Sequence, residues 1–302
     1  MHTSFLFTIP FFDIFFLVHY YGNYLLQKFF NFVKIEHTLF TLPLIYSGVV
    51  LGSHNFPPLD LLFLVLLAAI GARTVAFAFN RIIDRSIDFR NPRTANRELP
   101  SGKMKLSEAI LVLISGLALY ISSAAMISSF CLALSPIPLV IFIVYPYMKR
   151  FTVLAHFGVG MGMAMAPLGG WFAVNHSFEN IFPAILLSIF TIFWGAGFDI
   201  IYATLDEEFD KKENLFSFVS RFGKKKALAY SAIFHFIGFM ALVILFINTI
   251  RTWYATPFLL LTGGLLWFEQ RSTPKVDFAF FKINAGLGFV VFAMIITGVI
   301  AR

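Results

Sequence analysis

Apolar residues run along almost the whole chain, and short polar stretches divide them into nine long segments. A helix that crosses a bilayer needs about 20 mostly apolar residues, and most of these segments reach or approach that length. We therefore predict an all-α membrane protein with about nine transmembrane helices in a bundle. The predicted spans are residues 38–54, 59–80, 106–125, 127–147, 153–174, 181–204, 227–248, 253–268 and 281–300.

The first 33 residues are also apolar and aromatic, but they lie before the first predicted span. They lack a basic first region and a clear small-residue cleavage site, which argues against a secretory signal peptide. We expect an N-terminal apolar extension over residues 1–33 and a polytopic membrane domain over residues 34–302.

Composition supports the membrane interpretation. The chain has 302 residues, of which 59% are hydrophobic and 13% are charged, about half the charged fraction of roughly 25% expected for soluble domains. The mean hydropathy is +0.81. The single cysteine, Cys131, excludes an intrachain disulfide and any cysteine-based zinc or redox pair.

Positive charge is distributed unevenly between the two sides of the predicted bundle. Twenty of the 23 lysines and arginines lie in the loops around residues 81–105, 149–150, 206–226 and 270–282 or just before the first span. The positive-inside rule places these loops in the cytoplasm. This topology accounts for the net charge of +7, so no nucleic-acid partner is needed to explain it.

Two ladders of polar side chains close the second and sixth predicted spans, both on the cytoplasmic side. The first is Asn80, Asp84 and Asp88; the second is Asp199, Tyr202, Asp206 and Asp210. Residues four apart share one face of a helix, where like charges repel unless a cation is shared. Mg²⁺ prefers oxygen ligands and commonly bridges carboxylates to substrate phosphates. The ladders therefore predict a Mg²⁺-diphosphate site, although solvated charges at helix ends are the simpler alternative.

Basic residues surround the ladders, and most are interpreted as orientation charges. Lys149 and Arg150 end the fourth predicted span, where they are candidates to bind phosphate oxygens. Arg73 differs because it lies inside a span, two turns before Asn80. An intramembrane charge is costly and suggests function, and snorkelling is the alternative.

Aromatic and thioether side chains within the spans could shelter a carbocation through cation–π contacts, although plain packing also explains them. These residues are Met161, Met163, Met165, Phe193, Trp194 and Phe198. The glycines at 158, 160 and 162 are interpreted as sites of close helix packing.

The chain resembles the UbiA-type intramembrane aromatic prenyltransferases over about residues 34–300. The first ladder matches the family's Asn-x-x-x-Asp-x-x-x-Asp motif, and the second matches Asp-x-x-Tyr-x-x-x-Asp-x-x-x-Asp. Residues 34–40, 91–102 and 145–150 also resemble family segments.

The resemblance implies nine helices around a lipid-open cavity, capped by the two motif loops. It implies Mg²⁺-dependent ionisation of a polyprenyl diphosphate and alkylation of an aromatic ring by the allylic cation. The implied metal ligands are Asp84, Asp88, Asp206 and Asp210. Asn80, Lys149 and Arg150 are implied diphosphate contacts, and Lys34 or Arg73 would meet diphosphate or an acceptor carboxylate. Asp199 and Tyr202 would shape the acceptor end, or Asp199 would orient or deprotonate the phenol.

The resemblance favours 4-hydroxybenzoate as acceptor, in quinone biosynthesis at a bacterial inner membrane. A dihydroxynaphthoate of a menaquinone pathway is the alternative, since residues 34–37 and the Asn-Pro-Arg-Thr loop also resemble that branch. A transporter is the alternative of another class, because transporters also carry ionisable groups within their spans.

Overall fold

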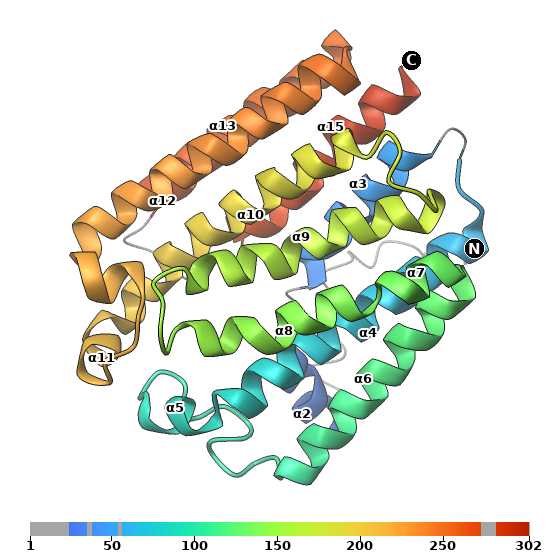
Figure 1. The fold of residues 1–302 in the computed structure, drawn as a ribbon. Helices are drawn as coiled ribbons and strands as arrows, with labels where there is room; N and C mark the ends of the chain where they lie inside the picture. The colour runs from blue at the N-terminus through green and yellow to red at the C-terminus, as the bar shows by residue number, and fades with distance from the viewer. Residues whose placement is uncertain (1–23, 35–37, 54–55, 273–281, 302) are drawn as a thin grey trace, which may run out of the picture.

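The computed structural model describes residues 24–34, 38–53, 56–272 and 282–301. Within these ranges the chain is helical and has no strand. The helices that correspond to the predicted spans run side by side as a slanted bundle (Figure 1). They are α3 (Thr38–Gly52), α4 (Leu59–Ile83), α6 (Leu106–Ile127), α7 (Ser129–Leu134), α8 (Pro136–Met148), α9 (Ala155–Val174), α10 (Phe182–Ala203), α12 (Phe218–Leu245), α13 (Thr256–Arg271) and α15 (Asn284–Ile300).

Each predicted span is occupied by helix, so the all-α membrane fold is confirmed. Six helical segments of the described chain are long and apolar enough to cross a bilayer by length and composition, so the count of nine is not confirmed. The fourth predicted span is divided into α7 and α8 because Pro136 starts a new helix after Ser135. α12 starts nine residues before its predicted span and is kinked at Gly223, which has a φ of 75°.

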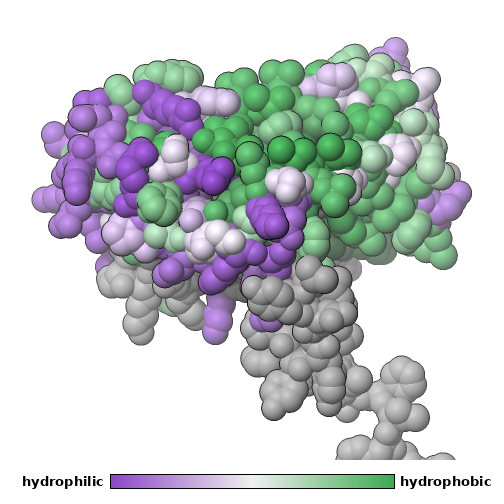
Figure 2. All heavy atoms as spheres, turned by 90° about the horizontal axis from the view of Figure 1, so that it is seen from below, coloured by the Kyte–Doolittle hydropathy of each residue, from purple (hydrophilic) through white to green (hydrophobic). Residues whose placement is uncertain are grey.

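Short helices gather at one end of the bundle. α5 (Arg85–Arg90) and α11 (Glu207–Lys212) both lie there, beyond the ends of α4 and α10 (Figure 1). Hydrophilic residues cluster at the same end in the view of Figure 2, and hydrophobic residues cover much of the remaining visible face. The two polar ladders therefore lie at the hydrophilic end of an otherwise apolar molecule.

Part of the predicted N-terminal extension lies outside the described residues. Its last part forms α2 (Tyr24–Val33), whose Phe32 is buried in a cluster with Ala78, Leu99 and Met104. Lys28 on the same helix makes a salt bridge of 2.6 Å with Glu108 at the start of α6. The helix thus packs on the membrane domain, and the predicted boundary after residue 33 stays a prediction.

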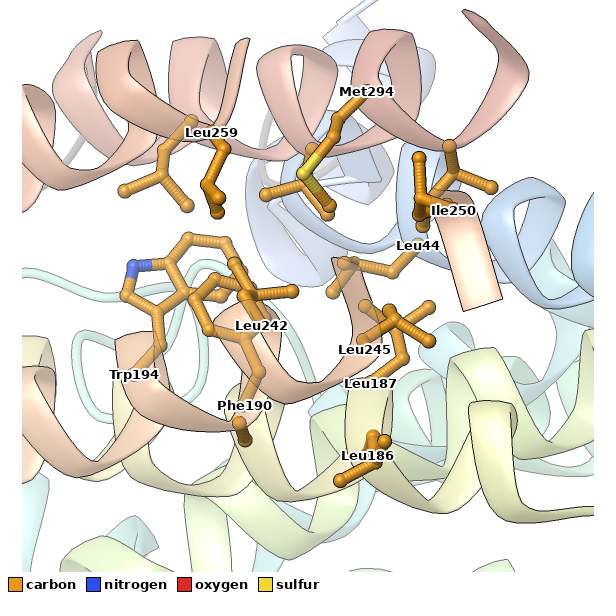
Figure 3. Close-up of a cluster of buried hydrophobic side chains, with 14 of the residues drawn as sticks. Leu44, Leu186, Leu187, Phe190, Trp194, Leu242, Leu245, Ile250, Leu259 and Met294 are labelled. Atoms are coloured by element: carbon orange, nitrogen blue, oxygen red, sulfur yellow. The ribbon is translucent and has the colours of Figure 1, made fainter. Parts of the chain in front are cut away.

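A dense hydrophobic core fills the half of the molecule built from α10, α12, α13 and α15 (Figure 3). Trp194 and Phe190 stack with ring centroids 5.5 Å apart, and the indole N–H of Trp194 donates to Asn284 Oδ1 at 2.7 Å. Phe198 contacts Trp194 within the same cluster. Of the two interpretations of Trp194 and Phe198, plain packing applies, because both lie in this core.

Candidate active site

The first ladder lies at a break between two helices. α4 ends at Ile83, and Asp84 separates it from α5 with a φ of −90° and a ψ of 1°. The backbone N–H of Asp84 still donates to Asn80 O at 3.0 Å, and that of Asp88 donates to Asp84 O at 2.8 Å. The four-residue stacking therefore survives without a continuous α-helix, and Asp84 and Asp88 are both buried.

Asp84 is held by basic groups from the end of α8. Lys149 Nζ donates to Asp84 Oδ2 at 2.6 Å, and Asn80 Nδ2 donates to the same oxygen at 3.2 Å. Arg150 lies 3.7 Å from Asp84 Oδ1, and that oxygen has no hydrogen-bond partner among the described residues. Burial raises the pKa of Asp84, and the Lys149 ammonium opposes the rise. The structure thus brings Asn80, Lys149 and Arg150 together at Asp84, while their assignment as diphosphate contacts stays a prediction.

Asp88 is bound by an arginine from the loop that follows α5. Arg97 Nη1 donates to both Asp88 oxygens, at 2.8 and 2.9 Å, and Arg81 lies 3.9 Å from Oδ2. Thr94 Oγ1 also donates to the Asp88 carbonyl at 3.0 Å. Arg97 was interpreted as an orientation charge, but its contacts with Asp88 make it part of the site.

The second ladder also crosses a change of helix type. α10 ends at Ala203, a 3₁₀ turn covers Thr204–Asp206, and α11 follows. Asp206 accepts hydrogen bonds from the loop of the first ladder: Asn91 Nδ2 at 2.8 Å, and Arg93 through both Nε, at 2.8 Å, and Nη2. Arg93 Nη1 also donates to the Tyr202 hydroxyl at 2.8 Å. Arg93 therefore links the loop that follows the first ladder to two residues of the second ladder.

Asp199 is bonded to a histidine that the sequence analysis did not identify. His156 Nδ1 lies 2.7 Å from Asp199 Oδ2, and His156 Nε2 accepts the backbone N–H of Phe218 at 3.3 Å. His156 is buried near the start of α9. An ionisable residue inside an apolar segment was the available signal, and the same rule identified Arg73.

The fit of Mg²⁺ rests on the donor set. Carboxylates and one amide are the hard oxygen donors that this ion prefers, and Asp84 Oδ1 is buried without a hydrogen bond. No group of three His, Cys, Asp or Glu side chains within the described ranges is gathered closely enough to hold a metal alone. Instead each of Asp84, Asp88 and Asp206 faces a basic side chain. This donor set fits a cation that also takes ligands from a bound diphosphate.

An apolar cavity of about 550 Å³ lies between α3, α4, α8 and α9. Val65, Met163, Met165 and Phe142 contribute to its hydrocarbon wall, so two of the three methionines considered from the sequence line this cavity. Arg73 is one of its few polar residues, and the guanidinium carbon lies 4.6 Å from the ring centroid of Phe77.

Two further predicted residues are Lys34 and Asp210. Lys34 follows the last turn of α2 and has a left-handed backbone, with a φ of 49°. Asp210 lies on α11, and its side chain interacts with Ser217. Their assignment to diphosphate and metal stays a prediction.

Helices of membrane-spanning length, an apolar cavity and two aspartate ladders are the features expected of an intramembrane prenyltransferase. The model of the UbiA prenyltransferase family matches residues 41–295, and the chain belongs to that family. It is an integral membrane prenyltransferase.

Relatives and solved structures agree with this assignment. A 4-hydroxybenzoate octaprenyltransferase of Francisella tularensis subsp. mediasiatica is 30% identical over 201 residues, 66% of this chain and 69% of the relative. One of Herminiimonas arsenicoxydans is 29% identical over 290 residues, 92% of this chain and 99% of the relative.

The apo structure of a UbiA homolog from Aeropyrum pernix K1 has a TM-score of 0.81 and 32% identity, and the match covers 87% of this chain and 98% of that one. A UbiA homolog from Archaeoglobus fulgidus, bound to DMAPP and Mg²⁺, shares the fold with a TM-score of 0.66 and 20% identity, over 88% of this chain and 99% of that one.

Proposed function

We propose that the protein transfers a polyprenyl group from a polyprenyl diphosphate to an aromatic acid such as 4-hydroxybenzoate. Two observations carry the proposal: Arg93, in the loop after the first ladder, bonds Asp206 and Tyr202 of the second, and Lys149 bonds the buried carboxylate of Asp84. The basic side chains around the ladders suit a polyanion, and the apolar cavity suits a hydrocarbon chain. The activity named for the relatives from Francisella and Herminiimonas supports the same substrates.

The diphosphate end is assigned to the ladders. Asp84, Asp88, Asp206 and Asp210 would hold Mg²⁺, which supplies positive charge to the departing diphosphate when bound. Asn80, Lys149 and Arg150 would bind diphosphate oxygens directly, and Lys34 would add a further cation. These groups stabilise negative charge that grows as the allylic C–O bond breaks.

The acceptor end is assigned to Asp199, Tyr202 and Arg73. As the C–O bond breaks, its electron pair leaves with the diphosphate and an allylic cation remains. An aromatic ring carbon then donates an electron pair to the cation, a C–C bond forms, and the ring proton is lost. Asp199 would orient or deprotonate the phenol, which makes the ring more electron-rich, while the apolar wall excludes water that would quench the cation.

The dihydroxynaphthoate alternative remains open because both acceptors carry a hydroxyl and a carboxylate. We further infer that the protein lies in a bacterial inner membrane with both motif loops in the cytoplasm, as the distribution of lysine and arginine suggests.

The test is a product assay with purified protein, using geranyl diphosphate as the soluble donor and each aromatic acid in turn. We expect a geranylated 4-hydroxybenzoate by mass spectrometry with Mg²⁺, and no product in excess chelator. Product from dihydroxynaphthoate alone would move the assignment to the menaquinone branch. No alkylated ring with either acid would overturn the proposal, and geraniol as the only product would indicate a hydrolase.

A further inference from the structure

We propose that His156 is a positioning residue that holds the carboxylate of Asp199 in place for the acceptor. This inference rests on the proposed function, because it assigns Asp199 to the acceptor end. The backbone N–H of Phe218 can only donate, so His156 Nε2 must accept that bond. In the neutral ring the proton then lies on Nδ1, from which it is donated to Asp199 Oδ2 at 2.7 Å.

His156 is less exposed than Asp199, as expected if His156 positions Asp199 and Asp199 contacts the substrate. The His156 side chain is 5% exposed, whereas that of Asp199 is 26% exposed. The bond to His156 occupies one carboxylate oxygen. The other, Oδ1, makes no hydrogen bond to the part of the chain that the structure describes. Asp199 Oδ2 is thus fixed by His156, and Asp199 Oδ1 can accept a hydrogen bond from the hydroxyl of the acceptor.

The packing of α9 against α10 sets this pair in register. A Cβ at Gly160 would lie 2.2 Å from Ile192 O, and one at Gly195 would lie 2.8 Å from the Gly160 Cα, so the helix backbones touch at this point. The two helices are antiparallel neighbours (Figure 1). One turn back along α9 and one turn forward along α10 bring His156 opposite Asp199.

The other ring nitrogen connects the acceptor end to the loop after the second ladder. Phe218 is the first residue of α12, whose early N–H groups have no partner within the helix. Two residues earlier, Phe216 N–H donates to the carbonyl of Lys149 at 2.7 Å. His156 therefore has a bond to each of two elements, and the two bonds can be removed separately.

Two substitutions separate the positioning role from a purely structural one. His156→Asn retains an amide donor at the same distance from the backbone as Nδ1, and it loses the acceptor for Phe218. His156→Gln reaches the Nε2 position with an acceptor, and it loses the donor to Asp199.

We expect His156→Gln to lower kcat about a hundredfold, the effect of losing one preorganised polar contact, with KM for geranyl diphosphate changed less than twofold. His156→Asn should keep kcat within about fivefold of wild type, while its Tm falls more than that of the glutamine variant. A kcat ratio of Asn to Gln above about ten supports the positioning role. A ratio near one, or below one, overturns it.

A second measurement is independent of turnover. Nitrogen NMR of ¹⁵N-histidine-labelled protein in nanodiscs should show His156 protonated on Nδ1, with resonances that move in Asp199→Asn. A proton on Nε2 would overturn the inference even if the enzyme is active. If wild-type protein shows the Nδ1 tautomer but alkylates no aromatic acid, the proposed function fails while the bond to Asp199 stands.

Discussion

Arg93 and Asp206 are 113 positions apart in the chain, and their side chains meet through two parallel hydrogen bonds, with Arg93 Nε 2.8 Å from Asp206 Oδ1. The fork pairs a residue from the loop of the first ladder with an acid of the second. Because each ladder alone offers few ligands, a divalent ion and a diphosphate need both ladders at one place. The Arg93–Asp206 pair holds the loop of the first ladder against the second ladder.

Loss of a ladder carboxylate should abolish most activity. Asp84→Asn and Asp206→Asn keep the side-chain volume and remove a hard anionic ligand, so we expect kcat to fall at least about a hundredfold. Steady-state assays with geranyl diphosphate at several Mg²⁺ concentrations measure this. Glu207→Gln is the control, since Glu207 pairs with the exposed Lys211 on the same helix. A near-normal rate in either aspartate variant would make that ladder structural.

The fork of Arg93 should matter beyond its charge. Arg93→Lys keeps one positive charge but cannot bond Asp206 through two nitrogens and Tyr202 through a third. We expect kcat/KM for the prenyl diphosphate to fall roughly tenfold. Arg90→Lys is the matched control in the same loop region, because Arg90 bonds Glu213 rather than a ladder acid, and it should stay within about twofold. Equal effects of both variants would contradict a special role for the fork.

The helix positions followed from the sequence because apolar length is a strong signal in a membrane protein. The sequence also placed Lys149 on the same side of the membrane as the ladders, because it ends a predicted span there. The finer breaks did not: four-residue spacing predicts a continuous helix, whereas α4 ends at Ile83 and restarts at Arg85. The four-residue spacing of the ladder is the same in a continuous helix and in two helices separated by one non-helical residue, so the sequence pattern does not distinguish them.

Contacts between distant segments were beyond the sequence. Arg93 and Arg97 looked like orientation charges because their loop is generally basic, and charge count does not reveal which arginine reaches an aspartate. The sequence left the place of Trp194 open for a similar reason, since apolar residues line cavities and cores alike. The signal that decided its place was the buried Asn284 on α15, which accepts the indole N–H.

Adding one methyl group where α9 and α10 approach most closely should destabilise the protein. In Gly160→Ala the added Cβ would overlap the carbonyl of Ile192, so we expect a destabilisation of about 1–3 kcal/mol and a lower Tm. Gly169→Ala on the same helix is the control, since a Cβ there meets nothing within 4 Å. Its Tm should be unchanged or slightly higher. Equal stability of the two variants would show that the helix pair can separate at little cost.

The orientation inferred from charge can be checked by labelling in intact cells. In a Cys131→Ala background, Lys103→Cys should be protected from an impermeant thiol reagent, because its loop is assigned to the cytoplasm. His176→Cys, in the exposed turn between α9 and α10, should react from outside. The reverse pattern would invert the assigned topology.

Arg73 provides the sharpest test of the acceptor end. It lies roughly 10 Å along α4 from Asn80, from seven residues at about 1.5 Å each, and it lines the apolar cavity. A cation at that depth is costly unless an anion compensates it, and the carboxylate of the aromatic acid would serve. We therefore expect Arg73→Gln to raise KM for 4-hydroxybenzoate at least about tenfold, the loss of one charge-assisted contact, with KM for geranyl diphosphate nearly unchanged.

A double-mutant cycle that combines the Arg73→Gln variant with a substrate lacking the carboxylate tests whether Arg73 contacts that carboxylate. If Arg73 binds the acceptor carboxylate, wild-type enzyme should have a lower kcat/KM for a phenol without the carboxylate than for 4-hydroxybenzoate. The Arg73→Gln variant should show little difference in kcat/KM between the two acceptors, because the contact is already absent. Additive losses would show that Arg73 and the carboxylate act separately. A raised KM for geranyl diphosphate alone would instead assign Arg73 to the diphosphate. Unchanged KM, kcat and Tm would leave Arg73 as a snorkelling residue without a role in catalysis.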